Sequence, residues 1–356
     1  MQTIAQNLLN WFETNRRNLP WRNTKDPYAI WVSEVMLQQT QVNTVIPYYK
    51  RFLKEFPSVS ILSKSTQDQV LKCWEGLGYY SRAINIHKAS KIVDDQYSGL
   101  VPSDPIVFRQ LPGVGDYINA AVQSIAFGHR MAVVDGNVRR VLSRLYEMPE
   151  TINESKYAKI FAKKAQALLS NKSPGDYNQA VMELGALICT PRNQQCNICP
   201  LSKNCQAFIH NTITKYPRRK KSPVIPTEHW LAAVIQKDNK FLLTQRKTGG
   251  FLGGLWEFPG GKIDTNENHQ NACLRLIKEQ LQIDIHVNNH VCQIKHTYTH
   301  FKQIMDAFLC HYRSGTIVLK GHTDFKWIDW SEINQFALPK SNLKFIKKFE
   351  KHIKKI

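Results

Sequence analysis

The sequence predicts a multidomain protein, with an all-α helix–hairpin–helix region that carries a metal-cluster loop and an α+β domain after it. The chain has 356 residues, which is more than one hydrophobic core normally serves. Apolar residues recur at helical spacing up to about residue 210, and strand-like runs follow a proline-rich basic stretch. Four of the eight cysteines lie close together near the end of the helical part.

These changes in pattern give the expected domain boundaries. We expect a helical region over residues 1–210 with a cluster domain around the grouped cysteines, a linker over 211–227 and a second domain over 228–356. The stretch KYPRRKKSPVIPTEHW (215–230) holds three prolines and five basic residues, a composition typical of an extended linker.

The second domain is expected to combine strands with two helices. HWLAAVIQ and KFLLTQR, separated by KDN, predict a β-hairpin. HQNACLRLIKEQL (269–281) predicts a helix, and strand-like runs lie at 283–287, 291–301 and 305–313. The basic tail KFIKKFEKHIKKI predicts an amphipathic helix.

The charge of the chain indicates a polyanionic partner. The formal net charge is +20 and the sequence pI is about 9.6, which fits nucleic acid or an acidic membrane surface, the alternative being a basic surface that serves solubility alone. No apolar run is long enough to span a bilayer, and the N-terminus has no signal core. We therefore expect a soluble cytoplasmic protein and no membrane partner.

The clustered cysteines predict an iron–sulfur site in the loop 189–205. Their spacing is Cys189-x6-Cys196-x2-Cys199-x5-Cys205. Zinc usually takes two tight pairs, whereas only one pair here is tight, so the spacing favours a [4Fe-4S] cluster and leaves zinc as the alternative. Because four thiolates leave no open iron, we expect the cluster to be structural.

The stretch LPGVGDY (111–117) predicts the turn of a helix–hairpin–helix over residues 107–127. Gly113 and Gly115 allow a tight turn and the close approach of another molecule. Backbone N–H groups at the start of the next helix form an anion site, and in a basic protein the anion expected is a DNA phosphate. A glycine-rich connector without a ligand is the alternative.

Two carboxylates suit cleavage of a glycosidic bond. Asp135 in VVDGNVRRVL stands at the N-cap of a helix, where N–H donors would keep it ionised. Glu34 in AIWVSEVMLQQTQV has apolar neighbours at helical spacing, which would raise its pKa and keep it protonated. A protonated acid facing an ionised carboxylate is the arrangement used for such bonds. The sequence alone does not say that the two groups meet.

Taken together, several strings resemble the adenine DNA glycosylase family (the MutY type). They are WVSEVMLQQTQV, WEGLGYYSR, LPGVGDYINAA, VDGNVRRVLSR, ELGALICTP and the cysteine spacing. The family removes adenine mispaired with 8-oxoguanine or guanine in double-stranded DNA by flipping it into a pocket. The resemblance implies that Glu34 protonates the adenine at N7, that Asp135 stabilises or bonds to the sugar oxocarbenium ion, and that Asn137 lies beside Asp135.

The resemblance also assigns Tyr117 to the catalytic pocket. Related bifunctional glycosylases have a lysine in this slot, which attacks the sugar and later cleaves the strand through a Schiff base. A tyrosine cannot do this, so we expect a monofunctional enzyme that leaves an abasic site. By the same resemblance Gln39 and Tyr79 enter the DNA stack, and Arg22 is a further expected DNA contact. We expect a monomer that acts at the bacterial nucleoid.

The C-terminal domain resembles the Nudix fold of pyrophosphohydrolases. Gly261, Glu267, Arg275 and Glu279 in LWEFPGGKIDTNENHQNACLRLIKEQLQI match the Nudix box, whose other acidic positions and late glycine are replaced. Loss of Mg²⁺-binding carboxylates makes hydrolysis unexpected. In the family this domain recognises 8-oxoguanine, and the resemblance places that contact at Tyr298-Thr299-His300, where an amphipathic strand is the alternative.

Four rival functions remain at this point. A bifunctional lyase of the same fold is disfavoured by Tyr117 and by the added domain. A thymine-mismatch glycosylase would lack the Nudix-like domain. A protein that binds lesions without catalysis is disfavoured by the presence of Glu34 and Asp135, and a nucleotide-pool hydrolase by the replaced acidic positions of the Nudix box.

Overall fold

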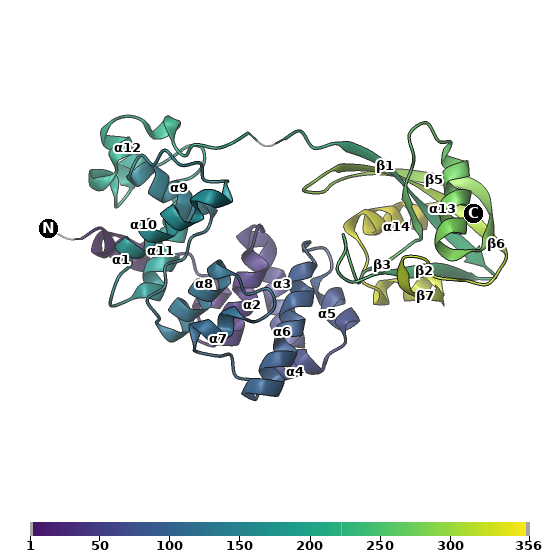
Figure 1. Ribbon diagram of the computed structural model, residues 1–356, viewed down its shortest axis with the longest axis horizontal. Coiled ribbons are helices and arrows are strands. Elements are labelled where there is room, and N and C mark those ends of the chain that lie inside the picture. Colours follow the sequence, from purple (N-terminus) through teal and green to yellow (C-terminus); the bar gives the residue numbers. More distant parts are fainter. Residues whose placement is uncertain (1–2, 222, 354–356) are drawn as a thin grey trace. The chain divides into compact units, whose positions relative to one another are not determined.

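The computed structural model describes residues 3–221 and 223–353 (Figure 1). The chain forms two compact units, one of Met1–Ser63 with Lys88–Ser222 and the other of Lys64–His87 with Pro223–Ile356. The predicted boundaries place residues 64–87 in the helical region. In the structure, the contacts that these residues make group them with the C-terminal domain. The linker is attached to the first unit up to residue 220, since Ile152 N–H bonds to the carbonyl of Arg218 and Asn153 bonds to Lys220.

The helical region consists of helices joined by short connections, as the apolar spacing predicts. The helices are α1 Ile4–Asn15, α2 Pro27–Leu37, α3 Val42–Glu55, α4 Val59–Lys64, α5 Gln67–Trp74, α6 Ser81–Tyr97, α7 Pro105–Arg109, α8 Asp116–Phe127, α9 Gly136–Leu145, α10 Ala158–Leu168, α11 Pro174–Leu187 and α12 Gln206–Ile209. Helix α2 is buried from Tyr28 to Met36, and it packs against α3 and α8.

A second group of helices builds the core that carries the cysteine loop. Apolar side chains of α1, α9, α10 and α11 meet there, among them Phe12, Leu142, Phe161 and Leu184. In α9 these positions recur at helical spacing, while the polar residues face outward or bond to the loop. The core therefore fixes α9 against α11, and α9 begins directly after Asp135.

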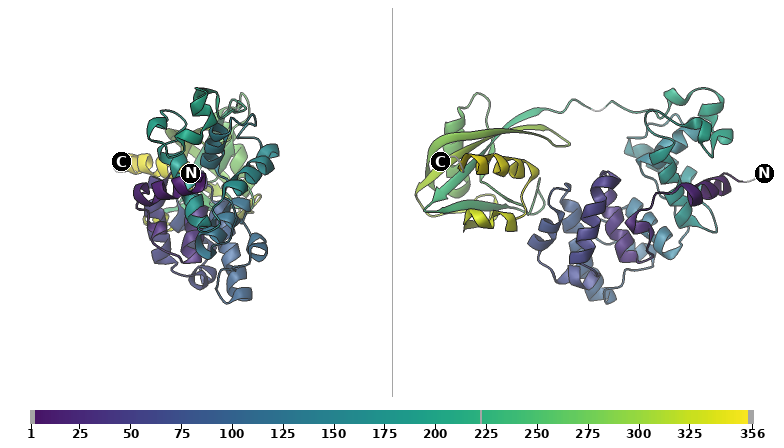
Figure 2. Two further views of the ribbon diagram at one scale, coloured as in Figure 1. Left: turned by 90° about the vertical axis from the view of Figure 1, so that its left-hand side faces the viewer. Right: turned by 180° about the vertical axis from the view of Figure 1, so that it is seen from behind.

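The C-terminal domain is a mixed sheet with a helix on each face (Figures 1 and 2). Its strands are β1 Thr227–Lys237, β2 Lys240–Arg246, β3 Trp256–Glu257, β4 Gly260–Lys262, β5 Asp284–Thr297, β6 Lys302–Ser314 and β7 His322–Ile328. Alternate residues of β1 face opposite cores, one with α14 (Lys340–Ile353) and one with α13 (His269–Leu281). That period of two is what a strand buried on both faces requires.

Most of the expected elements of this domain are confirmed. The hairpin of β1 and β2 and the helix over 269–281 lie where the sequence places them. The strand-like runs at 283–287 and 291–301 join into one irregular strand, β5, because pairing with β6 continues through several register shifts. Strand β7 was not expected, since its sequence HTDFKWI carries mostly polar residues. The last residues of the predicted tail helix lie outside the described residues.

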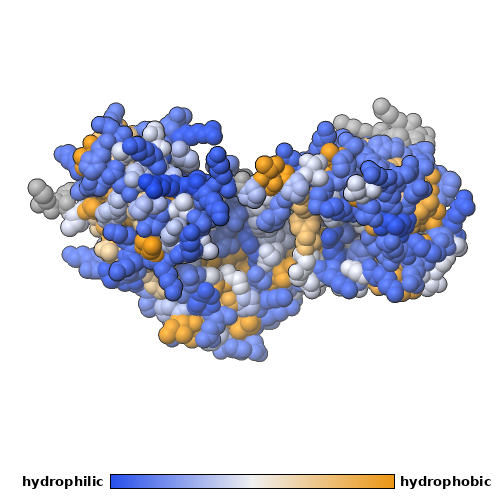
Figure 3. All heavy atoms as spheres, turned by 45° about the horizontal axis from the view of Figure 1, so that its top comes forward, coloured by the Kyte–Doolittle hydropathy of each residue, from blue (hydrophilic) through white to orange (hydrophobic). Residues whose placement is uncertain are grey.

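The surface is strongly polar. Figure 3 shows mostly hydrophilic residues on the face that it draws, with hydrophobic residues in small groups. Within residues 3–221 and 223–353, none of the helices has the length and apolar character needed to cross a membrane.

Candidate active site

Glu34 and Tyr117 meet where α2 packs against α8. Glu34 lies near the end of α2 and is only 4% exposed, which confirms the apolar surroundings expected from its neighbours. Tyr117 is the second residue of α8, directly after the hairpin turn. Its hydroxyl donates a hydrogen bond to Glu34 Oε2 over 2.6 Å and also lies 3.7 Å from Met182 Sδ.

The surroundings of Glu34 keep its carboxyl close to half-protonated at neutral pH. Burial raises the pKa of Glu34 to about 7, and the nearby carboxylate of Asp135 adds to that rise. The hydrogen bond from Tyr117 and the charge of Arg22 act in the opposite direction but are outweighed. An acid with a pKa near the working pH is well suited to donate a proton.

Asp135 caps α9 as the sequence predicts. Its side chain accepts hydrogen bonds from Val138 N–H over 2.7 Å and from Asn137 Nδ2 over 2.9 Å. These donors lower its pKa, but burial has the larger effect, so the pKa of Asp135 lies above its usual range. The prediction that N–H donors at the helix start keep Asp135 ionised did not include burial, which raises its pKa. The charge of Asp135 contributes to the raised pKa of Glu34, so the two carboxyls are near enough to interact electrostatically.

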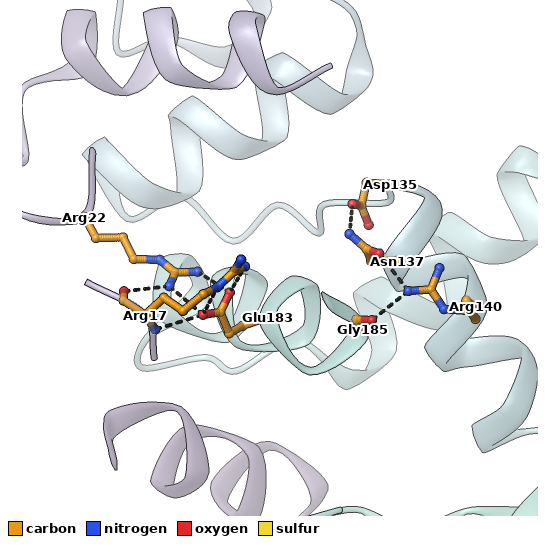
Figure 4. A network of polar contacts seen from close by, with 7 residues as sticks. All are labelled: Arg17, Arg22, Asp135, Asn137, Arg140, Glu183 and Gly185. Carbon is orange, nitrogen blue, oxygen red and sulfur yellow. Dashed lines mark hydrogen bonds and ion pairs between the residues drawn. The ribbon is translucent and has the colours of Figure 1, made fainter. Parts of the chain in front are cut away.

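Asn137 is held in place by an arginine that reaches the cysteine loop (Figure 4). Arg140 Nη2 donates to Asn137 Oδ1 over 2.8 Å and to the carbonyl of Gly185 over 2.7 Å, while Nε donates to the carbonyl of Cys189 over 2.7 Å. Helix α11 comes so close that a Cβ on Gly185 would stand 2.6 Å from Asn137 Cβ. Glycine at position 185 is thus what allows Asn137 to lie beside Asp135.

A buried ion-pair cluster near Glu34 was missed by the sequence reasoning. Glu183 of α11 is 1% exposed and accepts bidentate hydrogen bonds from Arg17 and from Arg22, at 2.6 to 2.9 Å (Figure 4). Burial alone would raise the pKa of Glu183, but these two arginines lower it to about 2. The guanidinium of Arg22, expected to contact DNA, is therefore engaged inside the protein and acts on Glu34 instead.

The two glycines of the hairpin turn differ in backbone conformation. Gly113 has φ +80, a conformation that favours glycine. Gly115 is the N-cap of α8 with φ −84, and a Cβ built on it meets nothing within 4 Å. Gln39 and Tyr79, expected at the DNA stack, both have left-handed backbone, with φ +55 and +48. Such conformations are costly and concentrate at functional sites.

The three residues of the expected reading motif lie in different environments. Tyr298 is half-buried, packs against Phe251 and Phe301, and its hydroxyl lies 3.1 Å from Ser341 Oγ. These contacts anchor Tyr298 in the loop, whereas the two following residues make fewer contacts with the protein. Thr299 and His300 are exposed, and Thr299 Oγ1 lies 2.9 Å from Tyr79 Oη.

The charged residues that match the Nudix box form ion pairs with one another. Arg275 bonds to Glu267 over 2.6 Å and to Glu279 over 3.2 Å. The bond from Arg275 lowers the pKa of Glu267. Gly261 pairs with Leu231 in the sheet. Arg275 of α13 therefore pairs with both remaining box carboxylates, Glu267 just before the helix and Glu279 within it.

The four cysteines gather at the core of the cluster domain. Cys189, Cys199 and Cys205 pack against the same apolar side chains, and the pKa values of Cys196, Cys199 and Cys205 are raised by burial first and then by the neighbouring thiols. Within the described part of the chain no three His, Cys, Asp or Glu side chains converge as they would on a single ion. Arg144 Nη1 lies 3.3 Å from Cys189 Sγ.

Comparison with known proteins agrees with this reading of the fold and site. Residues 32–167 match the model of the HhH-GPD superfamily base excision DNA repair proteins, and residues 231–348 match the NUDIX domain. A region of the helix–hairpin–helix base excision repair superfamily followed by a Nudix domain defines the protein as a DNA glycosylase of base excision repair.

Proteins of similar sequence show which family of DNA glycosylases the chain belongs to. Adenine DNA glycosylases are 39% identical in Buchnera aphidicola subsp. Baizongia pistaciae (71% of this chain, 72% of that protein) and 32% identical in subsp. Schizaphis graminum (98% and 99%). The human adenine DNA glycosylase is 30% identical over 93% of this chain and 71% of its own length. The chain belongs to the adenine DNA glycosylase family.

Solved structures resemble the helical part. A thermostable thymine-DNA glycosylase is 31% identical with a TM-score of 0.54, and the match covers 58% of this chain and 95% of that one. Endonuclease III in a non-covalent complex with DNA matches 58% of this chain and 94% of its own at 22% identity and a TM-score of 0.50, which shows a common fold.

Proposed function

We propose that the protein is a monofunctional adenine DNA glycosylase that hydrolyses the N-glycosidic bond of adenine opposite 8-oxoguanine or guanine and leaves an abasic site. The observation that carries the proposal is the 2.6 Å hydrogen bond from Tyr117 to Glu34, with Asp135 close enough to raise the pKa of Glu34 further. The proposal is supported by the contact of a buried acid with a side chain that has no amine, and by the effect of a second carboxyl on that acid.

Glu34 is the proton donor in this mechanism. Its pKa of about 7 leaves a large protonated fraction at neutral pH, and the proton goes to N7 of the flipped adenine. Protonation turns the base into a neutral leaving group. Tyr117 holds the carboxyl in one orientation through its hydrogen bond to Oε2, which leaves Oε1 to carry the proton to the base.

Asp135 stabilises the positive charge that develops on the deoxyribose as the base departs. The carboxylate form is supported by hydrogen bonds from Val138 N–H and Asn137 Nδ2, and these also fix its orientation. Tyr117 has no amine, so it cannot form a Schiff base with the sugar, and the strand stays intact. Water then adds to the sugar to give the abasic site.

The other expected sites have separate tasks in this proposal. The four cysteines (Cys189, Cys196, Cys199 and Cys205) would hold a [4Fe-4S] cluster, which gives the loop structural stability and takes no part in the bond cleavage. Gly113 and Gly115 let the DNA backbone approach α8. Gln39, Tyr79, Thr299 and His300 contact the DNA around the mispair. We further propose that the protein acts as a monomer in the bacterial cytoplasm.

A single-turnover assay with excess enzyme tests this function. The substrate is an end-labelled duplex with adenine opposite 8-oxoguanine, or opposite guanine or thymine in parallel samples, each divided into portions with and without alkali. Strand breaks that appear only after alkali, and only opposite 8-oxoguanine and guanine, are the expected result. Breaks without alkali would indicate a lyase. Full DNA binding without breaks in either portion would leave a protein that marks lesions.

The matched variant for this assay is Glu34→Gln. It keeps the size of the side chain and an oxygen that can accept the hydrogen bond from Tyr117, but it has no acidic proton. We expect DNA binding close to that of the unmodified protein and a loss of excision of at least 100-fold.

A further inference from the structure

Gly136, the first residue of α9, is a glycine that the free protein does not need. Its backbone is outside the left-handed region, and a Cβ built on it meets no atom within 4 Å. Glycine has a lower helix propensity than alanine, and no atom of the free protein excludes a methyl group at this position. The cap of α9 does not depend on it either, because the Asp135 side chain accepts the hydrogen bond from Val138 N–H.

Two other glycines, in contrast, are required by the packing of the protein itself. A Cβ on Gly185 would stand 2.6 Å from Asn137 Cβ, and one on Gly175 would stand 2.5 Å from the carbonyl oxygen of Ser124. Both glycines let helices approach each other. Gly136 is exposed and faces open space, so any atom that needs the missing side chain must come from outside the protein.

The position of that open space points to the substrate. The carboxylate of Asp135 is folded over the first turn of α9 by Val138 N–H and Asn137 Nδ2. Gly136 belongs to the same turn and is exposed beside this half-buried carboxylate. Because Gly136 directly follows Asp135 and no protein atom lies within 4 Å of a Cβ built on it, a methyl group there would occupy space on the solvent side of this turn.

We propose that Gly136 is a positioning residue, whose missing side chain lets the deoxyribose of the flipped nucleotide lie against the first turn of α9 and reach Asp135. The inference rests on the proposed function, because it takes the sugar of a flipped nucleotide as the group that Asp135 contacts. It adds a steric limit to that function, since the sugar must approach to within van der Waals contact of the backbone at position 136.

The test is Gly136→Ala, with Gly136→Val as the larger step. We expect Gly136→Ala to melt at or slightly above the temperature of the unmodified protein, because alanine is the better helix former. The single-turnover rate of adenine excision should fall at least ten-fold in Gly136→Ala and further in Gly136→Val. Affinity for a duplex with a tetrahydrofuran abasic analogue opposite 8-oxoguanine should fall in the same order.

Two controls make the result interpretable. Gly250→Ala adds the same methyl group at another glycine with ordinary φ and open space around it, and it should leave the melting temperature and the excision rate unchanged. Gly185→Ala adds the methyl group where there is no space, and it should lower the melting temperature.

Two outcomes would overturn the inference. One is a Gly136→Ala variant that excises adenine and binds the analogue as the unmodified protein does. The other is a clear drop in its melting temperature, because the position would then not be open. If the unmodified protein excises no adenine, the proposed function fails separately, and binding of the abasic analogue still compares the variants at position 136.

Discussion

The raised pKa of Glu34 predicts that this catalytic acid lowers the stability of the protein as the pH rises. A carboxyl whose pKa is higher in the folded than in the unfolded state binds more protons when folded, so folding weakens with increasing pH across the interval between the two values. That interval runs from the ordinary value of 4.5 to about 7. Glu34→Gln removes the titration and keeps the shape, so the variant should gain stability relative to the unmodified protein as the pH rises.

The size of the effect follows from the shift. A difference between 4.5 and about 7 corresponds to roughly 3 kcal/mol at most, at about 1.4 kcal/mol for each unit of pKa. Between pH 5 and pH 8 the stability difference between Glu34→Gln and the unmodified protein should therefore grow by about 2 to 3 kcal/mol. The full carboxylate charge then sits in a pocket that gives it one hydrogen bond, from Tyr117.

Urea unfolding at several pH values, followed by far-ultraviolet circular dichroism, measures this difference. Free energies of unfolding are extrapolated at pH 5, 6, 7 and 8 for the unmodified protein, Glu34→Gln and the surface control Glu13→Gln. The expected result is a widening gap for Glu34→Gln only. Parallel curves for Glu34→Gln and the unmodified protein would refute the assignment of a raised pKa and, with it, the role of Glu34 as the neutral-pH acid.

Other variants test the neighbouring groups. Glu183→Gln should lower the free energy of unfolding at pH 7 by about 3 kcal/mol, since it leaves the buried Arg22 without its carboxylate partner. Because the pKa of Glu183 is about 2, the unmodified protein should lose this contribution as the pH falls from 4.5 toward 2 in urea titrations. Tyr117→Phe removes a bond that lowers the pKa of Glu34, so the alkaline limb of the excision rate should move to higher pH in a pH–rate profile. Cys199→Ser should reduce bound iron and sulfide in chemical analysis, whereas an unchanged iron content would exclude it as a ligand. Gly185→Ala should cost about 1 to 3 kcal/mol of unfolding free energy by overpacking against α9, measured by urea unfolding.

Local pattern was sufficient for much of the fold. The helix over 269–281 begins after an asparagine cap and carries apolar residues on one face, so both its ends and its type follow from neighbouring residues. The N-cap role of Asp135 follows in the same way. Strand β7 was not predicted although Phe325 and Trp327 alternate with polar residues, because this alternation covers only a few residues and the strand begins with the polar residues HTD.

The contacts within the site could not be predicted from the sequence. Glu34 and Asp135 could be selected one by one, but their meeting depends on how α2 and α9 pack, and no local pattern encodes that. Glu183 lies 161 positions after Arg22 along the chain, so their ion pair leaves no short-range signal. The pKa of Asp135 was misjudged for the same reason, since burial is a property of the assembled fold.

The grouping of residues 64–87 with the C-terminal domain bears on how the gene can be divided. Asp68 accepts hydrogen bonds from Gln245 and from the indole of Trp256, and Glu75 accepts one from Leu338 N–H. A fragment that starts at the linker would lose these acceptors and expose an indole that is now 1% exposed. If the two halves were expressed separately, each would expose surface that is buried in the intact chain. An 8-oxoguanine affinity measured on the isolated C-terminal half would therefore not apply to the intact chain.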